Sequence, residues 1–331
     1  MTGRFSNEVL KFDCEQKALQ LAGALEETVL KKLRRRGVVV AVSGGIDSAC
    51  VAALAVRALG PKRVFGLLLP ERDSSSESTS LGRELCEHLG IAYEIHDIAP
   101  ALESIGCYER RNAAVRSVFP GFEPDMPWKI VLGTSGLNVF YVVVRTPDGT
   151  EHQVRLPPGA YLEIVAATNF KQRTRKMLEY FHADRLVFAV AGTPNRLEYD
   201  QGFFVKLGDG AADVKPIAGL YKSQVYALAR HLGVIPGILS REPTTDTYSL
   251  AQSQEDFYFS VHFSKMDLIL WAKNHGVEAT DVAPFVEMPA AEVEHVFADI
   301  DQKRRSTAYL HAKPVLLEEV AEVAPFAIEG R

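Results

Sequence analysis

The hydrophobic pattern of the chain alternates between short apolar runs of strand length and longer stretches with helical spacing. Buried strands are indicated at 38–42, 64–70 and 92–98, where apolar or β-branched residues are bounded by glycine, proline or polar residues. Helical spacing separates these runs at 49–59 and 80–89. Strands that alternate with helices predict a parallel sheet with right-handed crossovers, which binds its ligands at the carboxyl ends of the strands.

The same pattern extends on both sides of this unit. Residues 7–36 have helical spacing before the first strand, and residues 161–182 have it before a further strand at 185–191. The runs 139–145 and 152–156 are joined by a Pro-Asp-Gly turn, which is typical of a β-hairpin. We therefore expect a hairpin inserted between the third strand of the sheet and the fourth.

These elements predict an α/β fold: a doubly wound, mostly parallel sheet with helices on both faces, a β-hairpin insertion and a helical C-terminal part. Three regions follow from the pattern. Residues 1–36 form an N-terminal helical segment, 37–250 form the α/β core with an insertion at about 121–165, and 251–331 form a helical region packed on the core. Within the last region, helical spacing extends from about 254 to 323.

The first strand leads directly into a glycine-rich loop that reads Ser43-Gly44-Gly45-Ile46-Asp47-Ser48. Its two glycines allow a tight turn in which backbone N–H groups converge on an anion at the positive end of the next helix. Its two serines add hydroxyl donors. Asp47 would repel a phosphate unless a cation lay between them, so a Mg²⁺ ion that bridges Asp47 to phosphate oxygens is the obvious candidate.

A second polar segment follows the strand at 185–191. It contains Thr193 and Glu198, which the sheet topology places at the same edge as the glycine-rich loop. The next stretch, 201–213, holds three glycines among acidic and basic residues, as expected of a surface that holds a ligand.

Composition narrows the class of protein. The chain has 331 residues, of which 47% are hydrophobic and 24% charged, so it can bury a substantial core. No apolar run approaches the roughly 20 residues needed to cross a bilayer, and residues 1–8 lack the apolar segment of a signal peptide. We expect a cytoplasmic protein without a membrane partner.

The net charge of −5 argues against a nucleic-acid partner, and the four scattered cysteines indicate neither a zinc site nor a disulfide framework.

Taken together, the polar segments resemble the ammonia-dependent NAD synthetases of the ATP pyrophosphatase (PP-loop) superfamily. The blocks that carry the resemblance occur in the family's order: Ser-Gly-Gly-Ile-Asp-Ser at 43–48, Asn-Phe-Lys-Gln-Arg-Thr-Arg at 169–175, Gly-Thr-Pro-Asn-Arg-Leu-Glu-Tyr at 192–199 and Gly-Phe-Phe-Val-Lys-Leu-Gly-Asp-Gly-Ala-Ala-Asp at 202–213. The resemblance covers about 38–304 and implies a sheet of the adenine-nucleotide alpha-hydrolase type.

The resemblance also implies a reaction. In that family ATP adenylates the carboxylate of deamido-NAD, and ammonia then displaces AMP to give NAD. Mg²⁺ is the implied cofactor. Free ammonia, or ammonia from a separate protein partner, is the implied nitrogen source, and a homodimer is the implied assembly.

By position, the resemblance implies overlapping sets of site residues. The catalytic set is Asp47, Glu198 and Lys222, of which Asp47 and Glu198 hold Mg²⁺. The ATP contacts are Ser43, Gly44, Gly45, Ile46, Asp47, Ser48, Arg72, Thr193, Lys222 and Thr244. The deamido-NAD contacts are Arg173, Lys206, Asp213, Gln302 and Lys303.

Some features depart from the family's pattern. The segment at 121–165 exceeds what compact members carry, and it could be decoration, a dimer element or a lid for another substrate. Arg241 stands where lysine is frequent, and Gln302-Lys303-Arg304 is the nearest match to a His-Lys-Arg segment. The alternative function is therefore an amide ligase that adenylates a different carboxylate, in specialised or polysaccharide metabolism. A non-catalytic nucleotide-binding module is disfavoured because Asp47 and Glu198 are both present.

Overall fold

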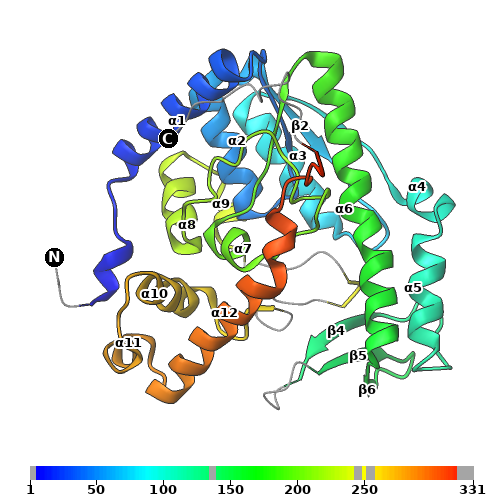
Figure 1. Cartoon of the computed structure of the whole chain (residues 1–331). Helices are drawn as coiled ribbons and strands as arrows, with labels where there is room; N and C mark the ends of the chain where they lie inside the picture. Colours follow the sequence, from blue (N-terminus) through cyan, green and yellow to red (C-terminus); the bar gives the residue numbers. More distant parts are fainter. Residues whose placement is uncertain (1–4, 134–138, 242–247, 251–257, 319–331) are drawn as a thin grey trace.

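A parallel sheet forms the centre of the protein (Figure 1). The computed structural model describes residues 5–133, 139–241, 248–250 and 258–318. Four strands lie in the order β3-β2-β1-β7. They are β1 (Val38–Ala41), β2 (Val64–Leu68), β3 (Ala92–Ile95) and β7 (Ala189–Ala191). All their pairings are parallel, and Val38 of β1 pairs with Val64 on one side and Ala189 on the other.

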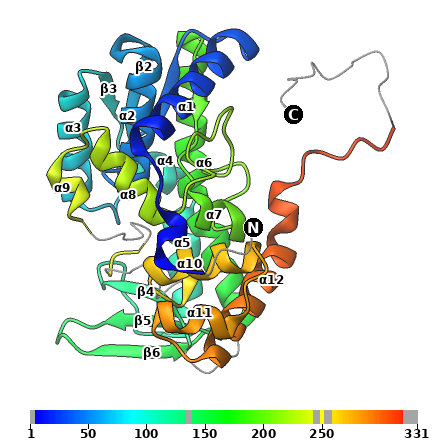
Figure 2. The ribbon, with the colours of Figure 1, turned by 90° about the vertical axis from the view of Figure 1, so that its left-hand side faces the viewer.

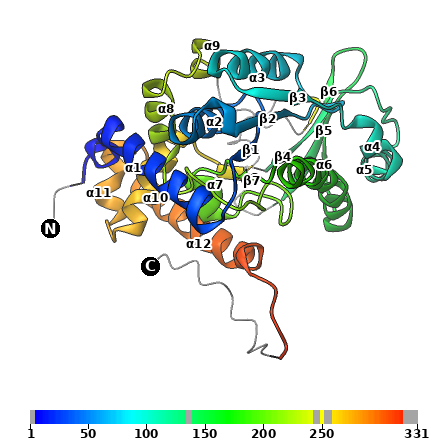
Figure 3. The same cartoon turned by 90° about the horizontal axis from the view of Figure 1, so that it is seen from above.

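Helices cover both faces of this sheet. Val38 and Val40 pack in a core with helices α1 (Cys14–Glu26), α2 (Ile46–Leu59), α3 (Ser76–Leu89), α8 (Lys222–His231) and α9 (Pro236–Leu239). Val39 points to the opposite face and packs with α4 (Ala99–Ser104), α5 (Cys107–Arg116) and α6 (Pro158–Leu186). Figure 3 shows α2 and α6 on opposite sides of the strands. The predicted doubly wound sheet is thus confirmed.

A second, antiparallel sheet lies beside the first turns of α6 (Figures 1 and 2). Its order is β4-β5-β6, with β4 (Trp128–Leu132), β5 (Phe140–Arg145) and β6 (Glu151–Arg155). β5 and β6 form the predicted hairpin, whereas the pattern analysis did not identify β4. The sheet packs through its apolar face on Val115 of α5 and Ile164 of α6.

The remaining helices build a separate apolar core. They are α7 (Arg196–Gln201), α10 (Phe263–Asn274), α11 (Ala279–Val286) and α12 (Ala290–His311). Ile269, Val282 and Ile300 are fully buried in this core and pack together with Leu197 of α7. The expected helical spacing to residue 323 is wrong for residues 312–318, which are not helical, and residues 319–323 lie outside the described part of the chain. None of the helices in the described part of the chain combines the length and apolar character needed to span a membrane.

Two predicted boundaries are wrong for local reasons. Residues 7–36 do not form one helix, because a 3₁₀ turn (Asn7–Leu10) precedes α1, and Asp13 caps α1 by accepting from the Gln16 N–H at 3.0 Å. The predicted strand at 185–191 begins only at Ala189. Its first residues continue α6, which ends where Val187 adopts a φ of 55°.

Candidate functional site

A cavity of about 640 Å³ lies where the loops after β1, β2 and β7 meet α6 and the start of α8. Parallel sheets bind ligands at this position, where chain connections diverge to either side of a central strand. Most of the predicted site residues line the cavity, namely Ser43, Gly45, Ile46, Asp47, Ser48, Arg173, Thr193, Glu198, Lys206 and Lys222. The structure therefore brings together residues that the sequence separates by up to 179 positions, from Ser43 to Lys222.

The glycine-rich loop forms the N-terminal cap of α2. Gly44 has a φ of +75°, and a Cβ added there would lie 2.3 Å from the Ser78 carbonyl oxygen, so the loop requires glycine at this position. The Ser48 hydroxyl accepts from the Ser43 N–H at 3.2 Å and donates to the Gly45 carbonyl at 3.0 Å. These bonds hold the positive end of α2 at the cavity, which suits a phosphate group.

Two carboxylates, Asp47 and Glu198, share a hydrogen-bond partner beside this loop. Asn195 links them, because its side-chain amide donates to Asp47 Oδ1 at 3.2 Å and its backbone N–H donates to Glu198 Oε2 at 3.1 Å. The sequence analysis gave Asn195 no role, although it stands in the same block as Glu198. The oxygen donors of the two carboxylates suit a Mg²⁺ ion that also binds phosphate oxygens.

Lys222 provides a fixed cation beside Asp47. It is only 1% exposed, and its Nζ pairs with Asp47 Oδ2. Burial alone lowers the pKa of Lys222, but the charges of Asp47 and Glu198 outweigh it and hold the pKa above its ordinary value. At the start of α8, the backbone N–H groups of Lys222 and Ser223 donate to Asp267 at 3.1 and 2.7 Å. Burial raises the pKa of Asp267 to about 6.

The predicted dinucleotide contacts Arg173 and Lys206 lie close together. Arg173 Nε donates to the Lys206 carbonyl at 3.3 Å, and Lys206 Nζ donates to the Tyr309 carbonyl at 2.7 Å. Arg173 and Lys206 both line the cavity. These contacts connect α6, the loop after α7 and α12 along one side of the cavity.

Arg72 and Asp213 were predicted as ligand contacts, but the structure does not bring either one to the cavity lining. Arg72 pairs with Glu103, and its guanidinium lies 4.4 Å from the ring centre of Tyr108. Asp213 Oδ2 accepts from the Val190 N–H at 2.7 Å. Both side chains therefore have structural partners in this arrangement.

The predicted C-terminal contacts also lie off the cavity. Gln302 is exposed on α12, and Lys303 donates to Asp299 at 2.6 Å and to the Tyr258 carbonyl at 2.5 Å. Tyr258, rather than Lys303, lines the cavity. Thr244 lies outside the described residues.

The loop after β2 is fixed by a buried network of charges. Lys171 Nζ lies 2.9 Å from Glu71 Oε1 and 2.6 Å from Asp73 Oδ2, and Arg111 lies 2.6 Å from the same Asp73 oxygen. Tyr108 donates to Glu71 Oε2 at 2.9 Å. Lys171 belongs to the 169–175 block, but the sequence alone did not reveal its two partners, which lie about 100 positions away.

The cavity wall holds further charged side chains, buried or partly buried, that were not predicted from the sequence. Lys176 and Glu179 on α6 pair at 2.6 Å, and Asp209 accepts from the Val205 N–H at 2.8 Å. Burial raises the pKa of Glu179 and that of Asp209. Polar residues spaced along a helix are typical of a solvated face, so the pattern carried no signal that this face lines a cavity.

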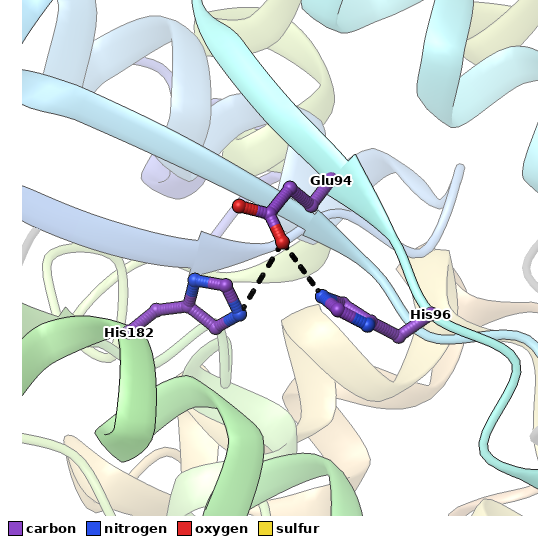
Figure 4. Close-up of side chains that lie close together, drawn as sticks. All are labelled: Glu94, His96 and His182. Atoms are coloured by element: carbon purple, nitrogen blue, oxygen red, sulfur yellow. Dashed lines mark hydrogen bonds and ion pairs between the residues drawn. The ribbon is translucent and has the colours of Figure 1, made fainter. Parts of the chain in front are cut away.

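A second cluster of ionisable side chains lies outside the cavity lining, between β3 and α6 (Figure 4). Glu94 Oε2 lies 2.9 Å from His96 Nε2 and 3.9 Å from the Nε2 of His182, which is only 1% exposed. Arg185 donates to Glu94 at 2.7 Å and to His182 Nδ1 at 3.0 Å. Burial lowers the pKa of His182. Arg185 connects Glu94 and His182, so the cluster forms one ion-paired and hydrogen-bonded network.

The model of the NAD synthase family matches residues 19–116 and 149–308. The part between, 117–148, contains β4 and β5 and overlaps the predicted insertion at about 121–165. The NH(3)-dependent NAD(+) synthetase of Rhizobium meliloti (strain 1021) is 53% identical over 323 residues, which cover 96% of each chain. The protein of the same name from Thermotoga maritima is 37% identical over 257 residues, or 77% of this chain and 86% of that one.

Solved structures share the fold. The NMN synthetase of Francisella tularensis superimposes with a TM-score of 0.65 at 24% identity, over 92% of this chain and 99% of that one. The NH3-dependent NAD synthetase of Campylobacter jejuni does so with a TM-score of 0.61 at 23% identity, over 93% and 100%. Since identities this low establish the fold alone, membership rests on the family model and the nearly full-length relatives. By that evidence, the chain belongs to the NAD synthase family.

Proposed function

We propose that this chain is an ammonia-dependent ligase that converts deamido-NAD to NAD at the expense of ATP, with release of AMP and pyrophosphate. One observation carries the proposal. The start of α2, the Asp47–Glu198 pair and Lys222 converge on a single cavity, in a chain that is 53% identical to a protein named NH(3)-dependent NAD(+) synthetase.

The chemistry explains why ATP is needed. A carboxylate is a poor electrophile, so an oxygen of the nicotinate carboxylate first attacks the α-phosphorus of ATP, and the bond to pyrophosphate breaks. Ammonia then attacks the acyl carbon, the bond to AMP breaks, and loss of a proton from nitrogen leaves the amide. Both steps develop charge on phosphate oxygens, so fixed positive groups and positioning supply most of the catalysis.

The residues of the cavity divide this work. The N–H groups at the start of α2 and the hydroxyls of Ser43 and Ser48 bind the pyrophosphate portion of ATP. Lys222 places a cation beside the reacting phosphates, and its buried pairing with Asp47 keeps it charged. Arg173 and Lys206 bind deamido-NAD. This division of roles leaves out the predicted site residues that do not line the cavity. The ATP contact expected of Thr244 stays a prediction.

Asp47 and Glu198 are the residues proposed to hold Mg²⁺. Asn195 fixes both carboxylates at one side of the cavity, and their oxygens match the ligand preference of this ion. A bound Mg²⁺ would neutralise charge on the leaving pyrophosphate. Calorimetric titration of Mg²⁺ in the presence of a non-hydrolysable ATP analogue tests the assignment, because Glu198→Gln should weaken binding of the ion.

The reaction is tested directly by incubating the purified chain with ATP, Mg²⁺, ammonium and deamido-NAD. Identification of NAD by mass spectrometry supports the proposal, and absence of NAD with every substrate present would refute it. The alternative, an amide ligase for another carboxylate, is not favoured, since the similar full-length relatives carry the name NAD synthetase.

We also propose a cytoplasmic homodimer that uses free ammonia. Support for the dimer comes from α6, whose residues Leu162, Met177 and Phe181 are 62%, 62% and 58% exposed. Large apolar side chains exposed along one helix mark protein–protein contacts. The four cysteines are free thiols, as is usual in the reducing cytoplasm.

A further inference from the structure

The antiparallel sheet contributes directly to the wall of the cavity. Phe140, the first residue of β5, lines the cavity together with Tyr161 of α6 and Tyr248. Phe140 belongs to the segment 117–148 that the family model leaves unmatched. This segment therefore reaches the site that the matched parts of the chain build.

The alternation of β5 explains why Phe140 faces the cavity. Phe140, Val142 and Val144 share one face of the strand. Val142 and Val144 are fully buried in the core that includes Ile164 of α6, while Phe140, at the strand's end, is half-buried. Its carbonyl accepts from the Leu156 N–H at 2.8 Å, so the position of the ring follows from the register of the sheet.

The rings at this end of the cavity form ordered pairs. Phe140 and Tyr161 stack with a centroid distance of 4.2 Å and an interplanar angle of 15°. Tyr248 packs edge-on against Trp128 of β4, at 4.9 Å and 67°. Trp128 is 1% exposed, so the sheet's buried core supports the rings that line the cavity.

The chemistry of this wall differs from that of the side of the cavity that holds the start of α2, Lys222 and Arg173. The α2 start, Lys222 and Arg173 present donors and cations that suit phosphates, whereas Phe140 and Tyr161 present aromatic surface. Both proposed substrates carry planar heteroaromatic rings besides their phosphates. We propose that Phe140 and Tyr161 form a stacking subsite for such a ring, which gives β5 a role in substrate binding.

This inference rests on the proposed function for the identity of its ligands, and Phe140→Leu tests it. The change keeps an apolar side chain but removes the aromatic face. An aromatic contact contributes about 0.5–1.5 kcal/mol beyond its buried area, which corresponds to roughly a twofold to tenfold change in affinity. We expect the KM for one substrate to rise within that range, with kcat changed by less than about twofold.

The substrate whose KM rises identifies the ring. A rise for ATP places its adenine on the wall, and a rise for deamido-NAD places a ring of that dinucleotide there. Kd values for ATP and for deamido-NAD should be measured separately by calorimetry. The Kd of each substrate should change in the same direction as its own KM. Phe140→Tyr, which keeps the aromatic face, should restore the wild-type KM and Kd.

Phe119→Leu provides a matched control. Phe119 packs against His152 of β6 with a centroid distance of 5.6 Å and does not line the cavity, so its loss should change neither KM nor Kd. Wild-type values for both substrates in Phe140→Leu would overturn the proposal, as would equal losses in Phe140→Leu and Phe119→Leu. If Phe140→Leu fails to fold, Tyr161→Leu replaces it with the same readouts. Formation of NAD by the wild-type enzyme tests the proposed function separately, and the Kd values remain informative if no NAD forms.

Discussion

At the scale of single residues, Asp47 faces the cavity and also neutralises the buried Lys222. We expect Asp47→Asn to lower kcat by about 100-fold or more, because a metal ligand is lost. The same change leaves Lys222 without its closest counter-charge, which costs about 3 kcal/mol of unfolding free energy. Steady-state kinetics and chemical denaturation measure the two effects. Asp301→Asn is the control. It breaks an ion pair with Lys273 in which the Asp301 side chain is 46% exposed, so kcat and the unfolding free energy should change little.

The pH dependence of stability separates these two roles of Asp47. In the wild-type protein the pKa of Lys222 is raised, so its contribution is complete below about pH 10 and is lost only as the pH rises through the folded-state pKa. In Asp47→Asn burial should dominate and lower the pKa below its unfolded value. Stability of the variant relative to wild type should then increase between pH 7 and pH 10. A constant difference across that range would contradict the proposed pairing.

Arg173 is predicted to recognise the dinucleotide. Arg173→Ala should raise the KM for deamido-NAD by about tenfold and that for ATP by less, because a charged contact to one substrate is removed. Arg145→Ala is the control, since that arginine pairs with Glu151 on the surface of the second sheet. Equal increases for both substrates would indicate that Arg173 only supports the Lys206 loop.

At this scale, the sequence blocks led to Asp47, Glu198 and Lys222 as candidates, and the structure brings all three to the cavity lining. Asn195 was missed because its side chain acts across the fold, on a residue 148 positions away. Arg72 is the reverse case, a predicted ATP contact that does not line the cavity. A charged residue in the loop after β2 was a reasonable candidate, but its contacts with Glu103 and Tyr108 depend on how that loop packs.

At the scale of elements, the loop between β1 and α2 depends on one glycine. Gly44→Ala should lower the unfolding free energy by about 1–2 kcal/mol from its positive φ, and further from the contact with the Ser78 carbonyl. Gly45→Ala is the matched control. Gly45 has a φ of −93°, and the nearest atom to an added Cβ is Ser43 Oγ at 3.4 Å, so this change should cost little stability. Thermal denaturation should show a large loss only for Gly44→Ala, and equal losses would contradict this account of the loop.

The sequence predicted elements well where one local pattern determined them. The runs at 38–42 and 64–70 became β1 and β2, since both faces of these strands are covered by helices. β4 was missed because its stability comes from pairing with β5 and from packing of Trp128 on Phe122 and Tyr248. None of these contacts is visible in five residues of sequence.

At the scale of the whole molecule, the exposed apolar residues on α6 predict a homodimer. Phe181→Glu should shift the mass measured by light scattering toward that of the monomer, because a charge would be buried in the interface. Leu19→Glu on α1 is the control, since Leu19 is similarly exposed at 57%. A monomeric wild-type protein, or a dimer unaffected by Phe181→Glu, would contradict the assignment of this surface.

In the proposed reaction, the cavity couples ATP cleavage to the carboxylate of deamido-NAD. Pyrophosphate release by the purified chain tests this coupling directly when it is measured with ATP, Mg²⁺ and ammonium, with and without deamido-NAD. We expect pyrophosphate release to depend on deamido-NAD and to match the amount of NAD formed. ATP binding without any release of pyrophosphate on addition of deamido-NAD would contradict it.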